Sequence, residues 1–244
     1  MIAVFSRAGR EELTARTLAL LAAAGASTSD RVLWWSGEVD PPVIPSSWRV
    51  DWRRGPPRGP VADWFEFIKT AAGRGDLHVF EDDVIPCRNL IPYIERTPVE
   101  WFTTYFNPWG APVGRAFELR GGLGFDCSQA ISIPARLVDR LAAAPDYAGP
   151  LGHDCIMSRL LASWNEPVLW DRTLVQHVAG NSSNGRRREF WLRDGKWVGA
   201  DFDALTIPTR QAAPGVWTGG YFLGVRPAVD LRSRPRPGAR MRRW

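Results

Sequence analysis

The sequence predicts a single α/β domain with a mixed, mostly parallel central sheet flanked by helices. Short apolar runs alternate with segments of helical periodicity through the first half of the chain. The 244 residues, of which 45% are apolar, are enough to bury one sizeable core. The last third instead combines turn residues with aromatic runs, which predicts a small β-rich C-terminal part.

The N-terminal segment reads as strand, loop and helix. Residues 2–5 form a short apolar run, and residues 11–24 repeat apolar side chains at helical spacing until Gly25. Residues 31–35 predict a second strand. Residues 41–60 are rich in Pro, Gly and Arg, which predicts an irregular surface loop.

A further helix and strand complete the alternating pattern. Residues 61–72 carry apolar side chains on one helical face, and the apolar run 77–80 predicts a third strand that ends at Glu81. Strands that alternate with helices favour a sheet that is parallel in its first half. Binding sites then collect beyond the carboxyl ends of the strands. We also expect a strand over 99–106 and a helix over 135–144.

The second half is more irregular. The apolar, Gly-rich stretch 116–133 leads into the helix over 135–144, and another helix is expected at about 154–164. An Asp-Gly pair between two aromatic-containing runs predicts a hairpin over 189–198. Residues 217–225 predict an extended segment. Residues 231–244 are dominated by Pro, Gly and Arg and predict a basic, flexible tail.

The positive charge of the chain comes almost entirely from arginine. The formal net charge is +5, and Lys69 and Lys196 are the only lysines. Arginine binds phosphates, carboxylates and aromatic faces well, so an anionic partner is one explanation. A GC-rich coding bias, which favours Arg over Lys without any functional reason, explains the composition equally well.

Cysteine spacing and apolar runs bear on the compartment. Cys87, Cys127 and Cys155 lie far apart and form no CxxC motif, so we expect reduced, mostly buried thiols. No run approaches the roughly 20 apolar residues of a membrane span. The N-terminal residues also lack the pattern of a signal peptide. These observations predict a cytoplasmic protein without a transmembrane segment.

Three consecutive acids follow the third predicted strand. Glu81, Asp82 and Asp83, here called the acidic triplet, present hard oxygen ligands where a buried strand reaches its carboxyl end. Mg²⁺ or Mn²⁺ accepts carboxylate and phosphate oxygens together and stabilises a departing phosphate. An acidic loop that caps a helix is the alternative, because a short motif alone is weak evidence.

The context of the triplet carries a resemblance to a known family. The segment 80–86, Phe-Glu-Asp-Asp-Val-Ile-Pro, resembles the hydrophobic-Glu-Asp-Asp-Val motif of GT-A-fold glycosyltransferases. It is most similar to the group of lipopolysaccharide-biosynthesis and collagen-type galactosyltransferases, and the resemblance covers about residues 1–183. It implies a nucleotide-sugar donor, expected to be a UDP-sugar. Glu81 and Asp82 would then contact the donor, and Asp83 and Glu81 would bind the metal.

A second motif supports the same family. Residues 174–183 are similar to its late Val-Gln-His-x-Gly-x-x-Ser segment, although an extra Ala here shifts the Gly by one place. The resemblance implies that His177 completes the metal shell begun by the acidic triplet, and imidazole is a good ligand for manganese. A hydrogen-bonded structural histidine is the alternative reading of His177.

A third segment contains the candidate catalytic base. In Gly152–Leu160 a carboxylate, Asp154, stands at the start of a predicted helix, where similar enzymes that invert configuration carry their catalytic Asp. Such a base deprotonates the acceptor hydroxyl as it attacks the anomeric carbon. An N-terminal cap is the structural alternative for Asp154. His153 is the substitute base or an acceptor contact.

The loop after the first strand is the expected site for the base and ribose of the nucleotide. Arg7 is the candidate for donor contact, whereas Arg10 and Arg16 are expected to be solvated charges of the following helix. Further on, the glycine-rich stretch 121–130 resembles the family's loop before the acceptor-side helix. Its Gln129, together with Asp126, is the candidate for contact with sugar hydroxyls.

The resemblance implies a domain of residues 1–230, with a donor half at about 1–110 and an acceptor half at about 111–230. The acceptor is left open between a glycan or lipid-linked saccharide, with the tail near an anionic surface, and a hydroxymethylated base in DNA. Arginine clusters at Arg53–Arg54, at Arg186–Arg188 and in the tail suit phosphate contact. A second class of function is a non-catalytic nucleic-acid-binding protein, but this class does not explain the acidic triplet. A nucleotidyltransferase is a third, and it lacks its Gly-rich, basic phosphate loop here.

Overall fold

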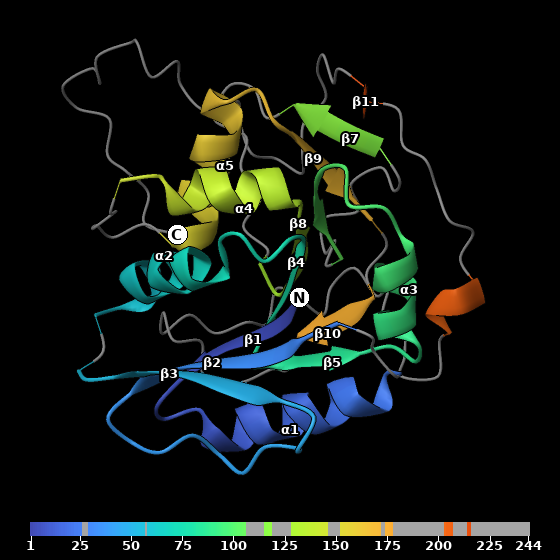
Figure 1. Cartoon of the computed structure of the whole chain (residues 1–244). Helices are drawn as coiled ribbons and strands as arrows, with labels where there is room; N and C mark the ends of the chain where they lie inside the picture. The colour runs from blue at the N-terminus through green and yellow to red at the C-terminus, as the bar shows by residue number, and fades with distance from the viewer. Residues whose placement is uncertain are drawn as a thin grey trace, which may run out of the picture.

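A mixed β-sheet with helices on both faces forms the centre of the structure (Figure 1). The computed structural model describes residues 1–25, 29–56, 58–105, 115–118, 128–145, 152–171, 174–177, 203–206 and 214–215. At residues 115–118, 176–177, 206 and 214–215 the description covers only the backbone. Of the predicted C-terminal elements, the hairpin at 189–198, the extended segment at 217–225 and the tail at 231–244 lie outside these residues.

Within the described residues the large sheet has nine strands in the order β11-β7-β9-β6-β8-β4-β1-β2-β3, and β10-β5 forms a second, two-stranded sheet. The strands are β1 (Ile2–Arg7), β2 (Arg31–Gly37), β3 (Arg49–Arg54), β4 (Leu77–Glu81), β5 (Val84–Pro86), β6 (Phe102–Thr104), β7 (Arg115–Glu118), β8 (Ala130–Ile133), β9 (Pro167–Trp170), β10 (Val175–His177) and β11 (Pro214–Gly215). The helices are α1 (Glu11–Ala23), α2 (Pro60–Ala71), α3 (Leu90–Arg96), α4 (Ala135–Ala142), α5 (His153–Ser163) and the short 3₁₀ helix η2 (Ala204–Thr206).

The first half of the sheet is parallel, which confirms the prediction. β1 pairs in parallel with β2 and with β4, and β2 pairs in parallel with β3. The carboxyl ends of these four strands therefore meet at one edge, at Arg7, Gly37, Arg54 and Glu81. Beyond β4 the sheet is mixed, because β8 is antiparallel to both β4 and β6. The predicted fold class is thus confirmed.

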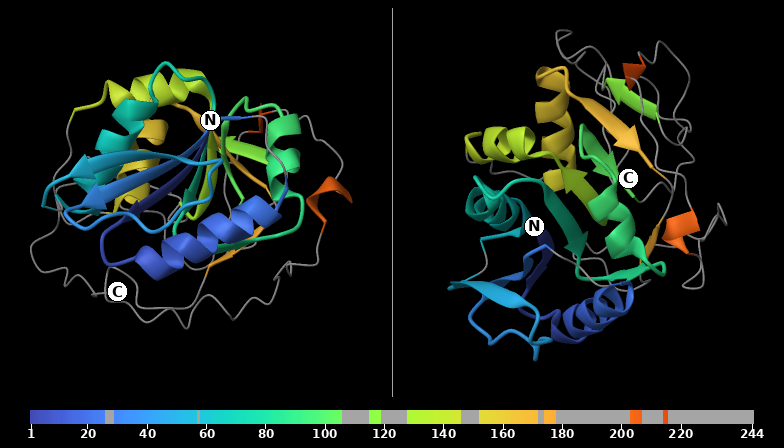
Figure 2. Two further views of the ribbon diagram at one scale, coloured as in Figure 1. Left: turned by 60° about the horizontal axis from the view of Figure 1, so that its bottom comes forward. Right: turned by 45° about the vertical axis from the view of Figure 1, so that its right-hand side comes forward.

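Alternation along the strands separates two apolar cores. Ala3 and Phe5 of β1 belong to the core that α2, α4 and α5 cover. Ile2 and Val4 belong to the core that α1 and α3 cover on the opposite face. The two turned views show the two sets of helices on opposite sides of the sheet (Figure 2). The side chains at the end of a strand continue this alternation. It therefore determines toward which face of the sheet each residue of the acidic triplet points.

One of the sequence predictions was wrong in the element that it assigned, and the helix α3 was not predicted. The loop predicted over 41–60 contains the strand β3, whose sequence Arg-Val-Asp-Trp-Arg-Arg is half-exposed along most of its length. An edge strand pairs on one side only, and its polar residues hide it from a search for apolar runs. Within the apolar, Gly-rich stretch 116–133 the structure describes β8 and the end of β7. The helix α3 was not predicted, because Pro92 interrupts its short apolar pattern.

A close approach between two strand ends shapes the loop after β1. Gly37 ends β2 with φ at 140°, and a Cβ atom built there would lie 2.5 Å from the Cβ atom of Ala8. The backbone N–H of Ala8 donates to the carbonyl oxygen of Ser36 at 2.8 Å. Glycine at this position therefore lets the loop of residues 8–10 lie close against β2. That loop positions Arg10.

No helix in the described part of the chain is long and apolar enough to cross a membrane.

Candidate functional site

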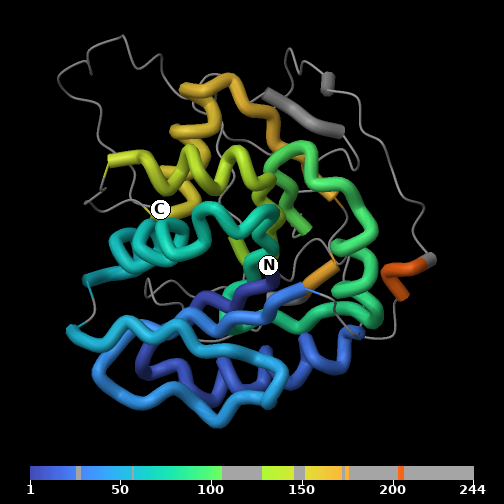
Figure 3. Tube along the Cα trace, in the orientation of Figure 1, coloured from blue at the N-terminus to red at the C-terminus, as the bar shows by residue number. Residues whose placement is uncertain are grey.

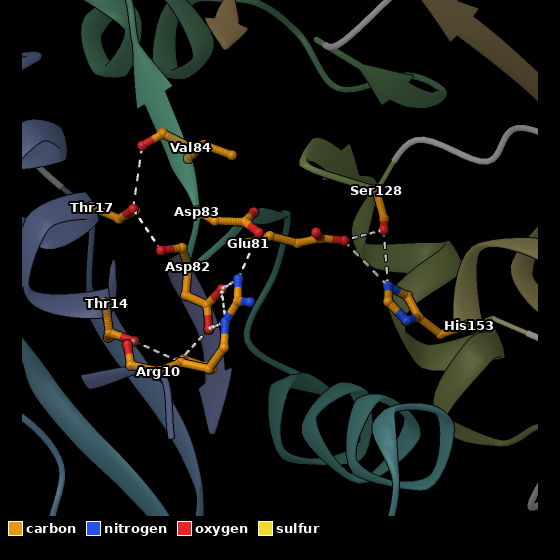
Figure 4. Close-up of polar contacts among 10 residues, drawn as sticks. Arg10, Thr14, Thr17, Glu81, Asp82, Asp83, Val84, Ser128 and His153 are labelled. Atoms are coloured by element: carbon orange, nitrogen blue, oxygen red, sulfur yellow. Dashed lines mark hydrogen bonds and ion pairs between the residues drawn. The ribbon is translucent and has the colours of Figure 1, made fainter. Parts of the chain in front are cut away.

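The acidic triplet begins at the last residue of β4, at the carboxyl edge of the parallel half-sheet (Figure 4). Glu81 continues the side-chain direction of Leu77 and Val79 and turns toward the α5 face, where it contacts Ser128. Asp82 turns the opposite way, toward α1. Because side chains alternate along the strand, Glu81 and Asp82 point to opposite faces of the sheet and contact different residues.

Arg10 binds Asp82 with two nitrogen atoms. Its Nε lies 2.9 and 3.0 Å from the two carboxylate oxygens of Asp82, and its Nη2 lies 2.5 Å from Oδ1. The same Nη2 donates to Oδ2 of Asp83 at 2.6 Å. Both carboxylates are buried, at 6% and 4% exposure for the two residues. One guanidinium therefore bridges two buried acids, as Figure 4 shows.

Hydroxyl groups from β1 and α1 support this bridge. Ser6 Oγ donates to Oδ2 of Asp82 at 2.6 Å and lies 2.6 Å from Thr14 Oγ1, which donates to the carbonyl oxygen of Arg10. Thr17 Oγ1 lies 2.8 Å from the carbonyl oxygen of Asp82 and 3.2 Å from that of Val84. The Asp82 carboxylate is consequently occupied by donors of the protein itself.

The charges in this bridge shift the ionisation of its members. Burial disfavours the charged guanidinium, but hydrogen bonds and the negative charges of Asp82 and Asp83 outweigh it and raise the pKa of Arg10. Burial raises the pKa of the Asp82 carboxyl, and Arg10 and Ser6 oppose that rise. Because a guanidinium does not deprotonate in proteins, we take the pair as ionic. Two carboxylates share one guanidinium, so this group of three side chains keeps a net negative charge.

Glu81 takes part in a separate chain of hydrogen bonds. Ser128 Oγ donates to Oε1 of Glu81 and lies 2.9 Å from Nε2 of His153. The same Nε2 lies 3.6 Å from Oε1 of Glu81. Because Ser128 has one hydroxyl proton and gives it to Glu81, it must accept from an N–H at Nε2 of His153. In the neutral form of the imidazole, the nitrogen without a proton is then Nδ1.

His153 is held in place by packing as well as by hydrogen bonding. It is the first residue of α5, and its ring stacks on Trp64 of α2 with centroids 4.5 Å apart. Burial alone would raise the pKa of Glu81, but the interactions with His153 and then with Ser128 hold the pKa of Glu81 below its ordinary value. Glu81 is thus the negative end of a Glu–Ser–His chain.

The short strand β10 brings the late histidine segment to the acidic triplet. β10 is antiparallel to β5, and the register places His177 opposite Val84, the residue after Asp83. Figure 3 traces the course of the chain in the orientation of Figure 1. The structure describes only the backbone of His177. Two segments that are far apart in the sequence therefore meet at the backbone beside Asp83.

The remaining predicted residues are placed less centrally. Arg7 ends β1 and is paired with Ser36 of β2 at the same edge. Gln129 is 7% exposed, and its carbonyl oxygen accepts from the backbone N–H of Glu81 at 3.0 Å. Asp154 is the second residue of α5, after Gly152 at the N-cap, and its Oδ1 accepts from the backbone N–H of Cys155. Asp126 lies outside the described residues.

One expectation about this site was wrong, and two contacts were missed. Arg10 is not a solvated helix charge, because its side chain is only 14% exposed and pairs with Asp82 and Asp83. Arg16 is exposed, as expected. The contacts of Ser128 and His153 with Glu81 were not predicted, because no spacing in the sequence connects the three. Only the placing of Arg10 directly before α1, in the loop after β1, could have indicated its role.

Two residues next to β5 could hold a divalent cation: Asp83 and, by its backbone position, His177. Asp83 already contacts a positive group, the guanidinium of Arg10, and carboxylate with imidazole is a ligand set that suits Mn²⁺. Asp82 is saturated by Arg10 and Ser6, and Glu81 is used by Ser128, so Asp83 and His177 are the candidate ligands. Among the side chains that the structure describes, no three His, Cys, Asp or Glu residues gather as a metal site.

Comparisons with known proteins identify the fold. No family model and no curated protein matches the sequence. The mannosyltransferase PcManGT from Pyrobaculum calidifontis, solved with GDP-Man and Mn²⁺, is similar with a TM-score of 0.52 at 10% identity. The match covers 75% of this chain and 58% of the mannosyltransferase. The galactosyltransferase LgtC, solved with donor and acceptor sugar analogues, gives a TM-score of 0.46 at 11% identity, over 78% of this chain and 92% of LgtC. The chain therefore has the fold of GT-A glycosyltransferases.

Proposed function

We propose that the chain transfers a sugar from a nucleotide-sugar donor to an acceptor hydroxyl, in a metal-dependent reaction. The fold supports this class, because it is shared with a mannosyltransferase. The position of the acidic triplet also supports it, since ligands of open α/β sheets bind beyond the carboxyl ends of the strands. The motifs of the triplet and of His177 resemble those of lipopolysaccharide-type and collagen-type galactosyltransferases, which supports the same class.

The pairing of β10 with β5 is the observation that carries the proposal. The resemblance in sequence predicts that His177 and Asp83 serve one metal, although nothing in their spacing brings them together. The register places His177 opposite Val84, beside Asp83. A purely structural acidic loop gives no reason for the late histidine motif to return to this point of the sheet.

Within this proposal Asp83 and His177 hold the divalent cation. A cation bound there offsets the negative charge that develops on the departing diphosphate. Asp82 holds Arg10, and Arg7 at the end of β1 lies on the donor side of the same edge. Burial of Asp83, together with the adjacent α1, limits the access of water to the carboxylate.

The acceptor proton is assigned to His153 in this proposal. The chain from Glu81 through Ser128 fixes the imidazole with Nδ1 unprotonated, and Trp64 holds the plane of the ring. A nitrogen so oriented can accept the proton of the attacking hydroxyl. Asp154 is the second candidate, and one of its oxygens is already bound by the N–H of Cys155. Attack from the face opposite the nucleotide gives inversion at the anomeric carbon, which NMR of the product tests.

The structure bears on the acceptor through one arginine cluster. A DNA acceptor would draw on Arg53 and Arg54 for phosphate contacts. Arg53 lies 3.7 Å from the buried carboxylate of Asp63 and donates to the carbonyl oxygen of Pro56, while Arg54 stacks over Trp52 at 3.9 Å. Both are engaged within the protein, so we propose a glycan or lipid-linked saccharide as acceptor. A gel-shift titration with duplex DNA over a salt series tests the other acceptor.

Donor hydrolysis is the direct test of the proposed activity. The full chain is incubated with UDP- and GDP-sugars and Mn²⁺ or Mg²⁺, and release of the nucleoside diphosphate is measured. We expect metal-dependent release from one donor, and its loss in Asp83→Asn. Arg16→Gln, an exposed change on α1, is the matched control and keeps the activity. Absence of release from every donor, together with absence of metal-dependent nucleotide binding by calorimetry, would contradict the proposal.

A further inference from the structure

The guanidinium of Arg10 is firmly anchored but only partly used. Its Nε and Nη2 atoms make all of its hydrogen bonds to Asp82 and Asp83. Within the described part of the chain, Nη1 makes no hydrogen bond. The side chain is 14% exposed, so it is not sealed from solvent. A planar guanidinium fixed on one edge therefore offers its other edge to an anion.

The anchor keeps its geometry because both sides of it are bound. Asp82 is 6% exposed and also accepts from Ser6, and the carbonyl oxygen of Arg10 accepts from Thr14. An arginine that is already held in one orientation loses little further conformational freedom when it binds a ligand. The site is thus preorganised for an anion before any ligand arrives.

Arg10 and a divalent cation would compete for the carboxylate of Asp83. Nη2 of Arg10 lies 2.6 Å from Oδ2 of Asp83, so a divalent cation at that carboxylate meets the positive guanidinium as a neighbour. Two positive groups on one carboxylate repel each other. A diphosphate between them removes that repulsion, because its negative charges attract both. Binding of the metal and of the diphosphate should therefore be coupled through Arg10.

We propose that Arg10 is a diphosphate-binding residue that couples nucleotide binding to metal binding. This inference rests on the proposed function. Asp82 holds the guanidinium through Nε and Nη2, Nη1 donates to a phosphate oxygen, and Asp83 passes from Arg10 to the cation. Without a nucleotide, Arg10 is the internal counter-ion of the two buried acids and opposes metal binding.

Two binding measurements on the full chain test this role. Mn²⁺ binding without nucleotide is measured by equilibrium dialysis, and UDP and GDP binding is measured by calorimetry at saturating Mn²⁺. In Arg10→Gln we expect Mn²⁺ alone to bind about two- to fivefold more tightly, because a competing charge is gone. We expect the preferred diphosphate to bind about 10- to 100-fold more weakly, because a charge-assisted hydrogen bond is lost. Arg16→Gln, with the same change of charge on the exposed face of α1, changes neither value.

Arg10→Gln leaves Asp82 buried without its cation, which can impair folding. The double variant Arg10→Gln with Asp82→Asn removes both charges of the pair together, and it should show the same loss of nucleotide affinity. If wild type binds Mn²⁺ and nucleotide and the variants bind nucleotide equally well, Arg10 does not contact the diphosphate. If they lose Mn²⁺ binding as well, Arg10 only shapes the metal site, and the inference is overturned. If wild type binds neither, the proposed function itself fails.

Discussion

The imidazole of His153 stacks on the indole of Trp64, with ring centroids 4.5 Å apart and planes inclined by 23°. Nε2 of the same ring is linked through Ser128 to Glu81. Packing therefore fixes the plane of the imidazole, and hydrogen bonding fixes which nitrogen carries the proton. Both features suit a general base, whereas one carboxylate oxygen of Asp154 accepts from the backbone N–H of Cys155.

His153→Gln should lower kcat by about 100- to 10,000-fold with little change in donor KM, because a general base acts in the chemical step. Asp154→Asn should cost less than about tenfold. Steady-state kinetics of nucleotide release, with circular dichroism to verify folding, gives both numbers. The reverse order of the two effects would return the base to Asp154.

His177→Ala should weaken Mn²⁺ binding by about 10- to 100-fold, because it removes a ligand from a shell in which the protein supplies few donors. Asp83→Asn should act similarly, and the double variant should lose little beyond the larger single effect, since both residues serve one ion. Equilibrium dialysis of Mn²⁺ in the presence of nucleotide measures this. An unchanged affinity in His177→Ala, beside a large loss in Asp83→Asn, would show that the pairing of β10 with β5 is structural only.

Thr17→Val should destabilise the protein by about 1–3 kcal/mol, because it removes the hydroxyl donor of two backbone carbonyls in a buried site. The two acceptors belong to Asp82 and Val84, on either side of Asp83, so Mn²⁺ affinity should fall as well. Urea unfolding measures the stability. Thr70→Val is the matched control: its hydroxyl bonds to the carbonyl of Phe67 at an exposed position of α2, and the change should stay within about 0.5 kcal/mol.

Acid should destabilise the fold through His78 on β4. Burial, and then the charge of the N-terminal ammonium, lower the pKa of His78 to about 4, and its Nδ1 lies 2.6 Å from Ser132 Oγ. The unfolded state, with a pKa of about 6.5, binds this proton more readily. His78 therefore costs no stability above about pH 6.5 and costs progressively more as the pH falls toward 4, by roughly 2–3 kcal/mol at pH 4.5.

Comparison of wild type with His78→Gln isolates this contribution from the carboxylates that titrate in the same range. Urea unfolding at pH 7.5 and pH 4.5 should show a smaller loss of stability in the variant. An equal loss in both proteins would mean that His78 takes up its proton in the folded state as easily as in the unfolded chain.

Cys87 should resist alkylation more than Cys155. Burial raises the pKa of the Cys87 thiol to about 12, and Cys87 is 1% exposed, whereas Cys155 on α5 is partly exposed. Since the thiolate is the reactive form, iodoacetamide at pH 8 should label Cys155 first. Peptide mass spectrometry after timed labelling distinguishes the two. Faster labelling of Cys87 would mean that the segment after β5 opens in solution.

The sequence by itself determined the alternation of strands and helices, the parallel first half of the sheet and the place of the acidic triplet at its carboxyl edge. These follow from local periodicity, since the spacing of apolar residues reports which face of a segment is buried. It determined less well the edge strand β3, because polar residues on a half-exposed strand leave no apolar pattern.

Only the tertiary structure decided which side chains meet. Arg10 looked like a helix charge until the loop after β1 placed it on Asp82 and Asp83. The sequence offers Glu81 as a metal ligand, and the structure shows that Ser128 and His153 also contact it. Periodicity gives the direction in which a side chain points, but the residue that it contacts belongs to another element. These contacts form only when the whole sheet is assembled.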